Sequence, residues 1–387
     1  MRYHSTIFHQ VLNFLPRSSF DADVLAARAN RYTKHFTARV QLIVNLYAQV
    51  SGKKSLRDIE AGLKVQHGSW YHLGIENIAR STISHANNRR DCRLYENLFY
   101  RKLQECRDYT PRHRFRFKNP LYALDSTTID LCLSVFPWAK FRKTKGALKI
   151  HALLDYQGTI PSFIVVHEAR RHDVKVARET DFPISSDSIV VMDKAYIDFQ
   201  WLHGLAAKGA YFVLRAKDNM KYRVLGQHKE PKKKAVVSDE IIRLEGPLTS
   251  QKYPDNLRLV TFYDAEKKKA LRFITNNFHL AASTIADIYK SRWDIENFFK
   301  WIKQNLKIKT FLGTSKNAVL TQIWTAMIYY LLLAYIKFQN KYAYTLLHLA
   351  RMIREALFKR ADIIDLMNLS SVSLKKGRDP CPQPTLF

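Results

Sequence analysis

The chain has 387 residues, and 63 Lys and Arg side chains against 34 Asp and Glu give it a formal net charge of +29 at pH 7. Such an excess of cations favours a polyanionic partner, because neutralising phosphates releases counterions and makes binding salt-dependent. Its hydrophobic content of 47% is ample for two or three packed domains. We find no signal peptide and no uninterrupted apolar run of about 18 residues, and the cysteines lack CxxC spacing. We therefore expect no membrane association and reduced thiols in a cytoplasmic protein.

Residues 1–118 carry helical patterns and few strand signals. Within them, Ser55–Leu63 begins with a Ser-x-x-Asp pattern that caps a helix. A loop with two glycines follows, and then a short segment, Ile78–Asp91, which is rich in hydrogen-bond donors and includes Arg80. Helix, turn and polar helix in this order are typical of a helix-turn-helix DNA reader, and an ordinary helical hairpin is the alternative. We predict a helical DNA-binding region over residues 1–118, with Arg80 among its DNA contacts.

From Pro120 onwards the sequence changes to strand patterns. The predicted elements are strand Leu121–Val135, hairpin strands Ala147–Asp155 and Thr159–Glu168, strand Ser188–Asp193, helix Phe199–Lys208 and strand Ala210–Ala216. Continuous apolar runs predict strands covered on both faces by helices, and hence an α/β fold. Trp138 lies in a basic segment after the first strand, and Lys143 and Lys145 in this segment are candidate DNA contacts.

The remaining sequence divides into an insertion and a helical part. Residues 217–280 hold short strands and the lysine clusters Lys232–Lys234 and Lys267–Lys269, which indicate a β-rich insertion. Helical patterns return at about Thr284 and include an apolar, core-type helix near Trp324–Ile336. A Pro-containing tail from Ser370 is expected to be disordered. We therefore predict core segments at 119–216 and 281–345, the insertion at 217–280, and C-terminal helices and tail at 346–387.

Three carboxylates stand out in a chain with so few acids. Asp125 and Asp193 end apolar strand runs, and Glu296 lies in a predicted helix, Tyr289–Lys303. On that helix Tyr289, Arg292, Glu296 and Lys303 fall within about 60° of arc at 100° per residue. Three acids brought together would repel one another unless a cation neutralised them, and Mg²⁺ prefers carboxylate oxygens. Each residue alone has an ordinary structural alternative: a strand-end cap for either Asp, and a salt-bridged helix face for the other residues.

The spacing Tyr289-x2-Arg292-x3-Glu296-x6-Lys303 resembles the YREK signature of DDE transposases of the insertion-sequence four family. The resemblance extends to the LDST sequence around Asp125 and the VVMDKAY sequence around Asp193, although many members carry Gly where Ala195 stands here. It covers roughly residues 120–340. It implies an RNase H-like catalytic domain with a β-rich insertion before the final Glu, preceded by a helical DNA-binding region.

By this resemblance Asp125, Asp193 and Glu296 would be the catalytic, metal-binding triad for two Mg²⁺ ions, which Mn²⁺ could replace. Tyr289, Arg292 and Lys303 would contact DNA, and Trp138 or Trp293 could hold a flipped base, core packing being the alternative for both. The implied activity is cleavage and transfer of DNA strands at terminal inverted repeats in a prokaryotic, nucleoid-associated protein.

The implied partners are transposon ends and target DNA, with a homodimer in the synaptic complex. No GxxxxGK[ST] loop is present, so we expect no ATP dependence. An RNase H-like nuclease and a non-catalytic DNA-binding regulator descended from a transposase are the alternatives. Retention of all three acids favours an active enzyme over the regulator.

Overall fold

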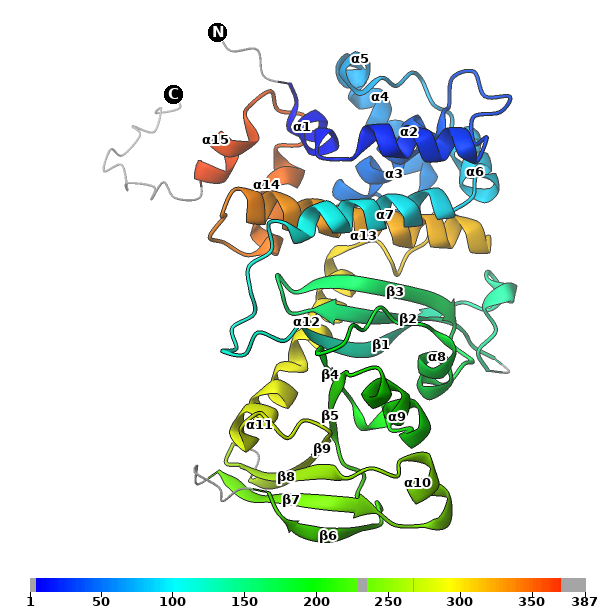
Figure 1. Ribbon diagram of the computed structural model, residues 1–387. Helices are drawn as coiled ribbons and strands as arrows, with labels where there is room; N and C mark the ends of the chain where they lie inside the picture. Colours follow the sequence, from blue (N-terminus) through cyan, green and yellow to red (C-terminus); the bar gives the residue numbers. More distant parts are fainter. Residues whose placement is uncertain (1–4, 143, 229–234, 267, 370–387) are drawn as a thin grey trace, which may run out of the picture.

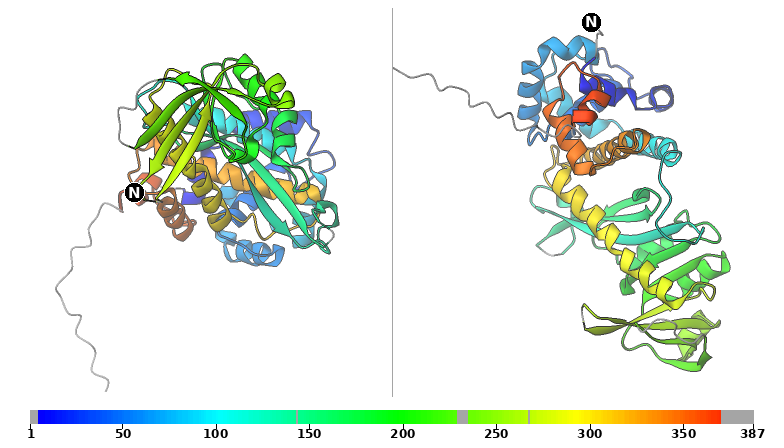
Figure 2. Two further views of the ribbon diagram at one scale, coloured as in Figure 1. Left: turned by 90° about the horizontal axis from the view of Figure 1, so that it is seen from below. Right: turned by 90° about the vertical axis from the view of Figure 1, so that its left-hand side faces the viewer.

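The computed structural model describes residues 5–142, 144–228, 235–266 and 268–369. Helices gather at one end of the molecule and a large sheet occupies the other (Figure 1). Two consecutive helices, α11 (Ala282–Ser291) and α12 (Trp293–Asn305), run along the sheet towards the helical end (Figure 2). The tail predicted to be disordered lies outside the described residues, as do Lys143 and the cluster Lys232–Lys234.

The N-terminal region is helical, as the sequence predicts. Its helices are α1 (Ile7–Asn13), α2 (Arg17–Ala26), α3 (Ala38–Val50), α4 (Leu56–Val65), α5 (Trp70–Leu73), α6 (Arg80–Arg89) and α7 (Arg93–Arg107). Ser55 caps α4 by accepting a 3.1 Å hydrogen bond from the backbone N–H of Asp58, which confirms the predicted cap. The short helix α5 adds one turn between α4 and α6, so the predicted helix, turn and polar helix are all present.

Within the described residues, nine strands form one mixed sheet in the order β3-β2-β1-β4-β5-β9-β8-β7-β6. They are β1 (Leu121–Leu131), β2 (Gly146–Asp155), β3 (Ile160–Glu168), β4 (Ile189–Met192), β5 (Tyr211–Arg215), β6 (Tyr222–Gln227), β7 (Val236–Leu244), β8 (Leu257–Asp264) and β9 (Lys269–Thr275). β2 and β3 form the predicted hairpin, and β1, β4 and β5 pair in parallel. A three-stranded meander followed by parallel strands is the order expected of the RNase H-like fold.

The strands of the β-rich segment continue this sheet. β9 pairs antiparallel with β5, and β8, β7 and β6 add outwards from it. The fully buried guanidinium of Arg258 donates to both carboxylate oxygens of Asp239 at 2.7 and 2.8 Å. It also donates to the carbonyls of Asn277 and Leu280, just before α11. Because a buried charge must keep its partners, these contacts fix the segment to the start of α11.

Helices cover both faces of the sheet, which confirms the predicted α/β fold. α11 and α12 pack on one face, and α8 (Asp173–Glu179), α9 (Phe199–Ala207) and α10 (Pro247–Lys252) lie on the other. Successive residues of a strand point to opposite faces. Accordingly Ile189 and Val191 of β4 lie in the hydrophobic core shared with α11 and α12. Val190 and Met192 lie in the second hydrophobic core, on the opposite face, with α8 and α9.

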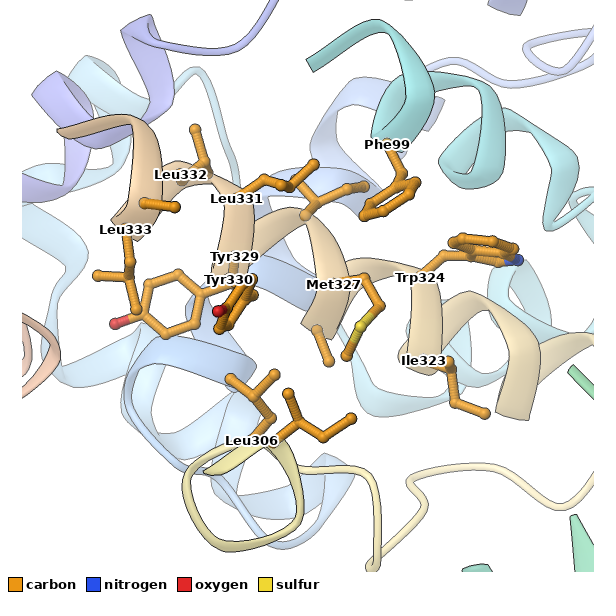
Figure 3. Close-up of a cluster of buried hydrophobic side chains, with 14 of the residues drawn as sticks. Phe99, Leu306, Ile323, Trp324, Met327, Tyr329, Tyr330, Leu331, Leu332 and Leu333 are labelled. Atoms are coloured by element: carbon orange, nitrogen blue, oxygen red, sulfur yellow. The ribbon is translucent and has the colours of Figure 1, made fainter. Parts of the chain in front are cut away.

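The helix α13 (Lys316–Gln339) is the centre of the larger core. It packs on α3, α6 and α7 of the N-terminal region and on β3 of the sheet. Figure 3 shows Trp324, Met327 and Leu331 of this helix among the buried side chains, with Phe99 of α7 beside them. By length and composition α13 could cross a membrane, but 89% of its most apolar window is buried inside the protein. It is the buried core helix that the sequence predicts. The helices α14 (Leu346–Glu355) and α15 (Ile363–Asn368) complete the described chain.

The helix predicted from Tyr289 to Lys303 is interrupted. α11 ends at Ser291 and α12 begins at Trp293, with Arg292 between them. The N–H of Arg292 donates to the carbonyl of Tyr289, and its carbonyl accepts from Ile295, so both hydrogen bonds span three residues instead of four. The prediction of one continuous helix was wrong at this residue. A single tightened turn changes the residue period too little for the sequence pattern to reveal it.

Candidate active site

A pocket of about 470 Å³ opens beside β1 and α12. The three predicted acids line it, and so do two of the predicted cations. These five residues are Asp125, Asp193, Glu296, Arg292 and Lys303. The structure therefore brings together five of the six residues that the sequence pattern associated with catalysis, from segments up to 178 positions apart.

The two aspartates meet because of strand register. β1 and β4 pair in parallel with Leu124 opposite Met192. The next residue on each strand is therefore a carboxylate, Asp125 on β1 and Asp193 immediately after β4. β1 continues to Leu131, so Asp125 lies within its strand, whereas Asp193 follows the end of β4. Because residues paired in register point to the same face of a sheet, both acids reach the same side of the pocket.

Glu296 enters from the other wall, on the first turn of α12. Ile295, Phe299 and Ile302 of this helix are buried, and the helix packs on β1. This packing leaves Glu296 and Lys303 at the rim of the apolar face, where both line the pocket. The residues that bury the helix therefore also aim its polar side chains at the two aspartates.

Arg292 bridges two of the acids. Its Nη1 donates to Oδ2 of Asp125 at 3.1 Å, and its Nη2 donates to Oε1 of Glu296 at 2.5 Å. The side chain is only 16% exposed, and its Nε has no partner among the described residues. The guanidinium therefore places a positive charge between a strand carboxylate and a helix carboxylate.

Burial raises the pKa of Asp125 to about 6. The N–H of Ser126, which donates to Oδ1 of Asp125 at 2.7 Å, and the Arg292 cation both act in the opposite direction. The neighbouring Asp193 and Glu296 raise the pKa further. An acid in this pocket is thus partly desolvated and close to other acids, and a cation stabilises its ionised form.

The donor set suits a divalent ion. Carboxylate oxygens are the ligands that Mg²⁺ prefers, and the Arg292 cation already lies between two of these carboxylates. Within the described ranges no three His, Cys, Asp or Glu side chains are close enough to form a complete metal cage. Ion binding by all three acids therefore requires a rearrangement in which Arg292 releases Asp125 or Glu296.

The remaining helix residues lie around this centre. Burial and the nearby Lys309 lower the pKa of Lys303, so two cations share one side of the pocket. Tyr289 is half-buried, with its ring 4.7 Å from that of Phe273 and the Arg292 guanidinium 5.8 Å from its centroid. Tyr289 thus supports Arg292 from outside the pocket lining.

A polar network behind the aspartates was not predicted from the sequence. The Oδ1 atom of Asp173, in the first turn of α8, accepts from Ser126 Oγ and Lys149 Nζ, both at 2.9 Å. The same atom lies 3.4 Å from Nε2 of the fully buried His151. His151 Nδ1 is in turn 3.1 Å from the hydroxyl of Tyr196, three residues after Asp193. Asp173 therefore connects the segments that carry both aspartates.

The signal that links these residues is the strand register, which no local pattern in the sequence reveals. In the sequence, His151 is one histidine within the predicted strand Ala147–Asp155, and Asp173 is one acid between two predicted strands. Burial lowers the pKa of His151 to about 3, so its ring is neutral, while Lys149 and Ser126 lower the pKa of Asp173. Only the register that sets Ser126 opposite His151 brings the parts together.

Within the described ranges, the other residues predicted to contact DNA do not line the pocket. Trp138 donates its indole N–H to the carbonyl of Thr314 at 2.7 Å, which fixes its basic loop to the segment before α13. Trp293, at the start of α12, is 61% exposed. Lys145 and Arg80 are exposed, on the loop before β2 and on α6 respectively, and Lys143 is outside the described residues.

Comparison with protein families gives two matches. Residues 116–332, more than half of the chain, match the family described as "Transposase DDE domain", and this range contains the whole pocket. Residues 3–76 match a family described as "Domain of unknown function (DUF4372)".

Individual relatives agree with the first match. The chain is 30% identical over 274 residues to a protein of Geobacillus stearothermophilus named as the transposase for insertion sequence element IS5377, covering 69% of this chain and 70% of the relative. It is 32% identical over 265 residues to the transposase-named protein y4zB of Sinorhizobium fredii, covering 67% and 73%. A Synechocystis protein named as the transposase for IS4SA is 24% identical over 291 residues, covering 75% and 81%.

Among solved structures, a piggyBac transposase synaptic complex with hairpin DNA aligns with a TM-score of 0.46 at 10% identity, covering 96% of this chain and 82% of that one. The family match and the bacterial relatives confirm the resemblance that the YREK spacing suggested. The chain belongs to the DDE transposase family of insertion sequences, and it is a DNA transposase whose metal-dependent catalytic domain cleaves and transfers DNA strands.

Proposed function

We propose that this transposase recognises the terminal inverted repeats of its insertion sequence and moves the element by cut-and-paste transposition, with Asp125, Asp193 and Glu296 as its catalytic acids. One observation carries the assignment: the three acids converge on a single pocket, where a largely buried guanidinium bridges two of them. Such a centre attracts a cation and, through its lysines, a phosphate.

The three acids would hold two Mg²⁺ ions, for which Mn²⁺ can substitute. When bound, these ions supply charge stabilisation for the attacking and leaving oxygens of an in-line phosphoryl displacement. The protein contributes two carboxylates from paired strands and one from a packed helix, and these side chains would draw together once Arg292 releases Asp125 or Glu296.

The cations would hold the DNA phosphates on either side of the scissile bond. Arg292 would exchange its carboxylate partners for a phosphate, to which its planar fork can donate two hydrogen bonds. Lys303 and Lys309 line the same pocket and would hold a neighbouring phosphate. The exposed indole of Trp293 would stack on an unpaired base, whereas Trp138 uses its N–H within the protein.

The partners would be double-stranded transposon ends and target DNA. Residues 1–118 would read the ends through α6, where Arg80 is exposed in the first turn. Lys143 and Lys145 would contact the backbone near the active pocket. Because two ends must be joined to be transposed together, the synaptic complex would contain two copies of the chain. These activities belong to the cytoplasm and nucleoid of a prokaryotic cell.

Isosteric replacement of the acids tests the catalytic assignment. Asp125→Asn, Asp193→Asn and Glu296→Gln should each abolish cleavage of a labelled terminal-repeat duplex in Mg²⁺, while affinity measured by gel shift stays close to wild type. Asp181→Asn is the matched control, because it makes the same chemical change at an exposed acid outside the pocket. Normal cleavage by any of the three pocket variants would remove that residue from the triad.

A second experiment tests sequence reading by the full-length chain. Arg80→Ala should reduce the preference for a terminal repeat over a scrambled duplex, because base-edge contacts carry sequence discrimination. The ratio of the two dissociation constants measures this preference. A wild-type protein that binds both duplexes equally would contradict recognition of the ends.

A further inference from the structure

A second hollow lies in the helical region. A groove of about 800 Å³ separates α6 from segment 27–36, which connects α2 to α3. Arg28, Arg31 and Lys34 line it from the segment, and Arg89 lines it from α6. All four of these side chains are exposed. We call this hollow the basic groove.

The charge of the basic groove is not compensated locally. Its lining includes two acids, and both have other partners: Glu76 pairs with His35 at 2.9 Å, and Asp91 accepts from the backbone N–H of Arg93 at 2.9 Å. Over the described part of the chain, none of the four groove cations forms an ion pair. Exposed, unpaired cations on two facing walls form a site for a polyanion.

Segment 27–36 has no regular structure, yet side-chain contacts hold it in place. The partly buried guanidinium of Arg90 donates to the carbonyls of Ala29, at 3.1 Å, and Phe36. It also donates to the amide oxygen of Gln41 at 3.0 Å and lies over the ring of Phe36. Asn30 accepts from the first N–H of α3 at 2.7 Å. The segment is thus fastened near both ends to α3 and α6.

Two residues of the segment adopt a backbone conformation that L-residues rarely use. Arg28 has a φ of 48° and Tyr32 a φ of 61°. Such conformations cost free energy and persist only where the surroundings enforce them. Both of these side chains are exposed: Tyr32 is 91% exposed, and the Arg31 guanidinium lies 4.8 Å from its ring centroid. A strained, fastened loop that displays arginine and an aromatic ring is pre-organised for a ligand.

The groove is also joined to the catalytic half of the molecule. Asn317 of α13 donates to the carbonyls of Asn87, at 2.9 Å, and Arg90, at 2.6 Å, at the end of α6. Ser315 donates to Asn88 at 2.6 Å, one residue after Thr314, which accepts from Trp138. The end of α6 and the basic loop after β1 therefore attach to one short stretch of chain. That stretch continues back to Lys309 in the active pocket.

We propose that the basic groove binds the sugar-phosphate backbone of the duplex whose end lies in the active pocket, so that segment 27–36 grips DNA beside α6. The proposal rests on the proposed function, because it assigns the groove to the same DNA. Arg31, Lys34 and Arg89 contact phosphates, and the ring of Tyr32 packs on a sugar. The contact is independent of sequence and gives the DUF4372 region a role in backbone binding rather than in base reading.

The experiment compares salt dependence between two double variants of the full-length protein. Arg31→Ala with Lys34→Ala removes two groove charges. Lys221→Ala with Lys252→Ala removes two exposed charges, one directly before β6 and one at the end of α10. Both elements lie at the opposite end of the molecule from α6 (Figure 1). Affinity for a terminal-repeat duplex and a scrambled duplex is measured between 50 and 400 mM salt. All four positions are exposed, and thermal unfolding checks that every variant remains folded.

The groove variant should bind at least about tenfold more weakly at 100 mM salt. Its slope of log affinity against log salt should fall by about 1.8, because each lost phosphate contact removes about 0.9. The loss should be equal on both duplexes, and the control variant should keep the wild-type slope on the terminal repeat. A groove variant with a wild-type slope overturns the proposal. If the groove variant binds DNA normally but loses binding to polyglutamate, the proposal is also overturned. The groove is then assigned to an acidic protein.

Cleavage at saturating DNA separates this proposal from the proposed function. The groove variant should cleave at the wild-type rate once bound, because its active pocket is unchanged. If the wild type fails to cleave terminal repeats, the proposed function fails, while the salt slopes still decide the groove. If the groove variant binds normally but cleaves slowly, the groove proposal fails and the proposed function stands.

Discussion

The active pocket and the basic groove both present arginine, but in opposite electrostatic settings. In the pocket, Arg292 is largely buried and bonded to two carboxylates. In the groove, Arg31 is exposed and lies against an aromatic ring instead of an acid. A buried charge must be paired, whereas an exposed charge is hydrated and remains available to bind a partner from solution. The same side chain therefore organises acids in one region and is free to meet a polyanion in the other.

This difference predicts where the effects of mutation will appear. Charges in the partly desolvated pocket interact strongly with one another and with a developing transition state, so their removal should change rates. Charges in the groove are screened by solvent, so their removal should change affinity and its salt dependence.

The largest of these effects is expected at Arg292. Arg292→Ala should slow cleavage by about 10²–10³-fold, the usual loss when one charge-stabilising donor is removed from an active site. Arg292→Lys should recover only part of the rate, because lysine lacks the planar fork. Single-turnover cleavage at saturating DNA measures the rate, and Arg31→Ala provides the comparison in the groove. Equal rate losses for Arg292→Ala and Arg31→Ala would contradict the proposed difference between the pocket and the groove.

A smaller rate effect is expected at Asp173. Asp173→Asn weakens the contacts to Lys149 and Ser126, and the segments that carry Asp125 and Asp193 should lose their fixed positions. Changes behind metal ligands typically cost about 10–100-fold in metal affinity or activity. The apparent metal affinity, measured by titrating cleavage with Mn²⁺, should weaken, and high Mn²⁺ should restore the rate. A loss that Mn²⁺ does not change would indicate a general folding defect.

Lowering the pH from 7 to 5 should weaken metal binding in the pocket about tenfold. Burial raises the pKa of Asp125 to about 6, so the carboxyl becomes protonated as the pH falls through 6. Metal binding needs the ionised form, and it should therefore weaken about tenfold between pH 7 and pH 5. Mn²⁺ binding to the DNA-free protein, followed by electron paramagnetic resonance, measures this change. Asp125→Asn should lack that part of the pH dependence, and an identical profile in this variant would assign the titration elsewhere.

The smallest effect is expected from Tyr32. Tyr32→Ala removes an exposed ring and no charge, so binding should weaken by only about two- to fivefold and the salt slope should stay unchanged. Tyr32→Phe should bind like the wild type if packing alone matters. Fluorescence anisotropy at several salt concentrations distinguishes the variants. A lower slope in Tyr32→Ala would mean that the ring orients the neighbouring cations.

Much of the active pocket could be predicted from the sequence because its parts are encoded locally. Apolar runs ending at Asp125 and Asp193 gave the strands, and helical spacing placed Glu296 and Lys303 on one side of a buried stripe. Once β1 and β4 pair in parallel, the acids that follow Leu124 and Met192 meet by register. The fold class followed from the same runs, since strands that are apolar on both faces need helices on both sides.

Other parts depend on contacts that no local pattern encodes. The bridge from Arg292 to Asp125 joins residues 167 positions apart, and it exists only in the folded chain. Asp173 gains its role from the pairing of β1 with β2 and from the turn after β4. Segment 27–36 has no period to detect, because its shape comes from Arg90, more than 50 residues later.

The buried helix α13 has a consequence for how this enzyme can change over time. Its apolar surface is shared between the N-terminal helices and β3, so neither half has a complete core without it. An exchange of residues 1–118 between relatives would leave α13 facing side chains with which it had never packed. New end specificities should therefore arise by substitutions on α6 and in segment 27–36 rather than by exchange of whole modules. A chimaera that keeps α13 with its own α3 and α7 should fold, and one that separates them should aggregate.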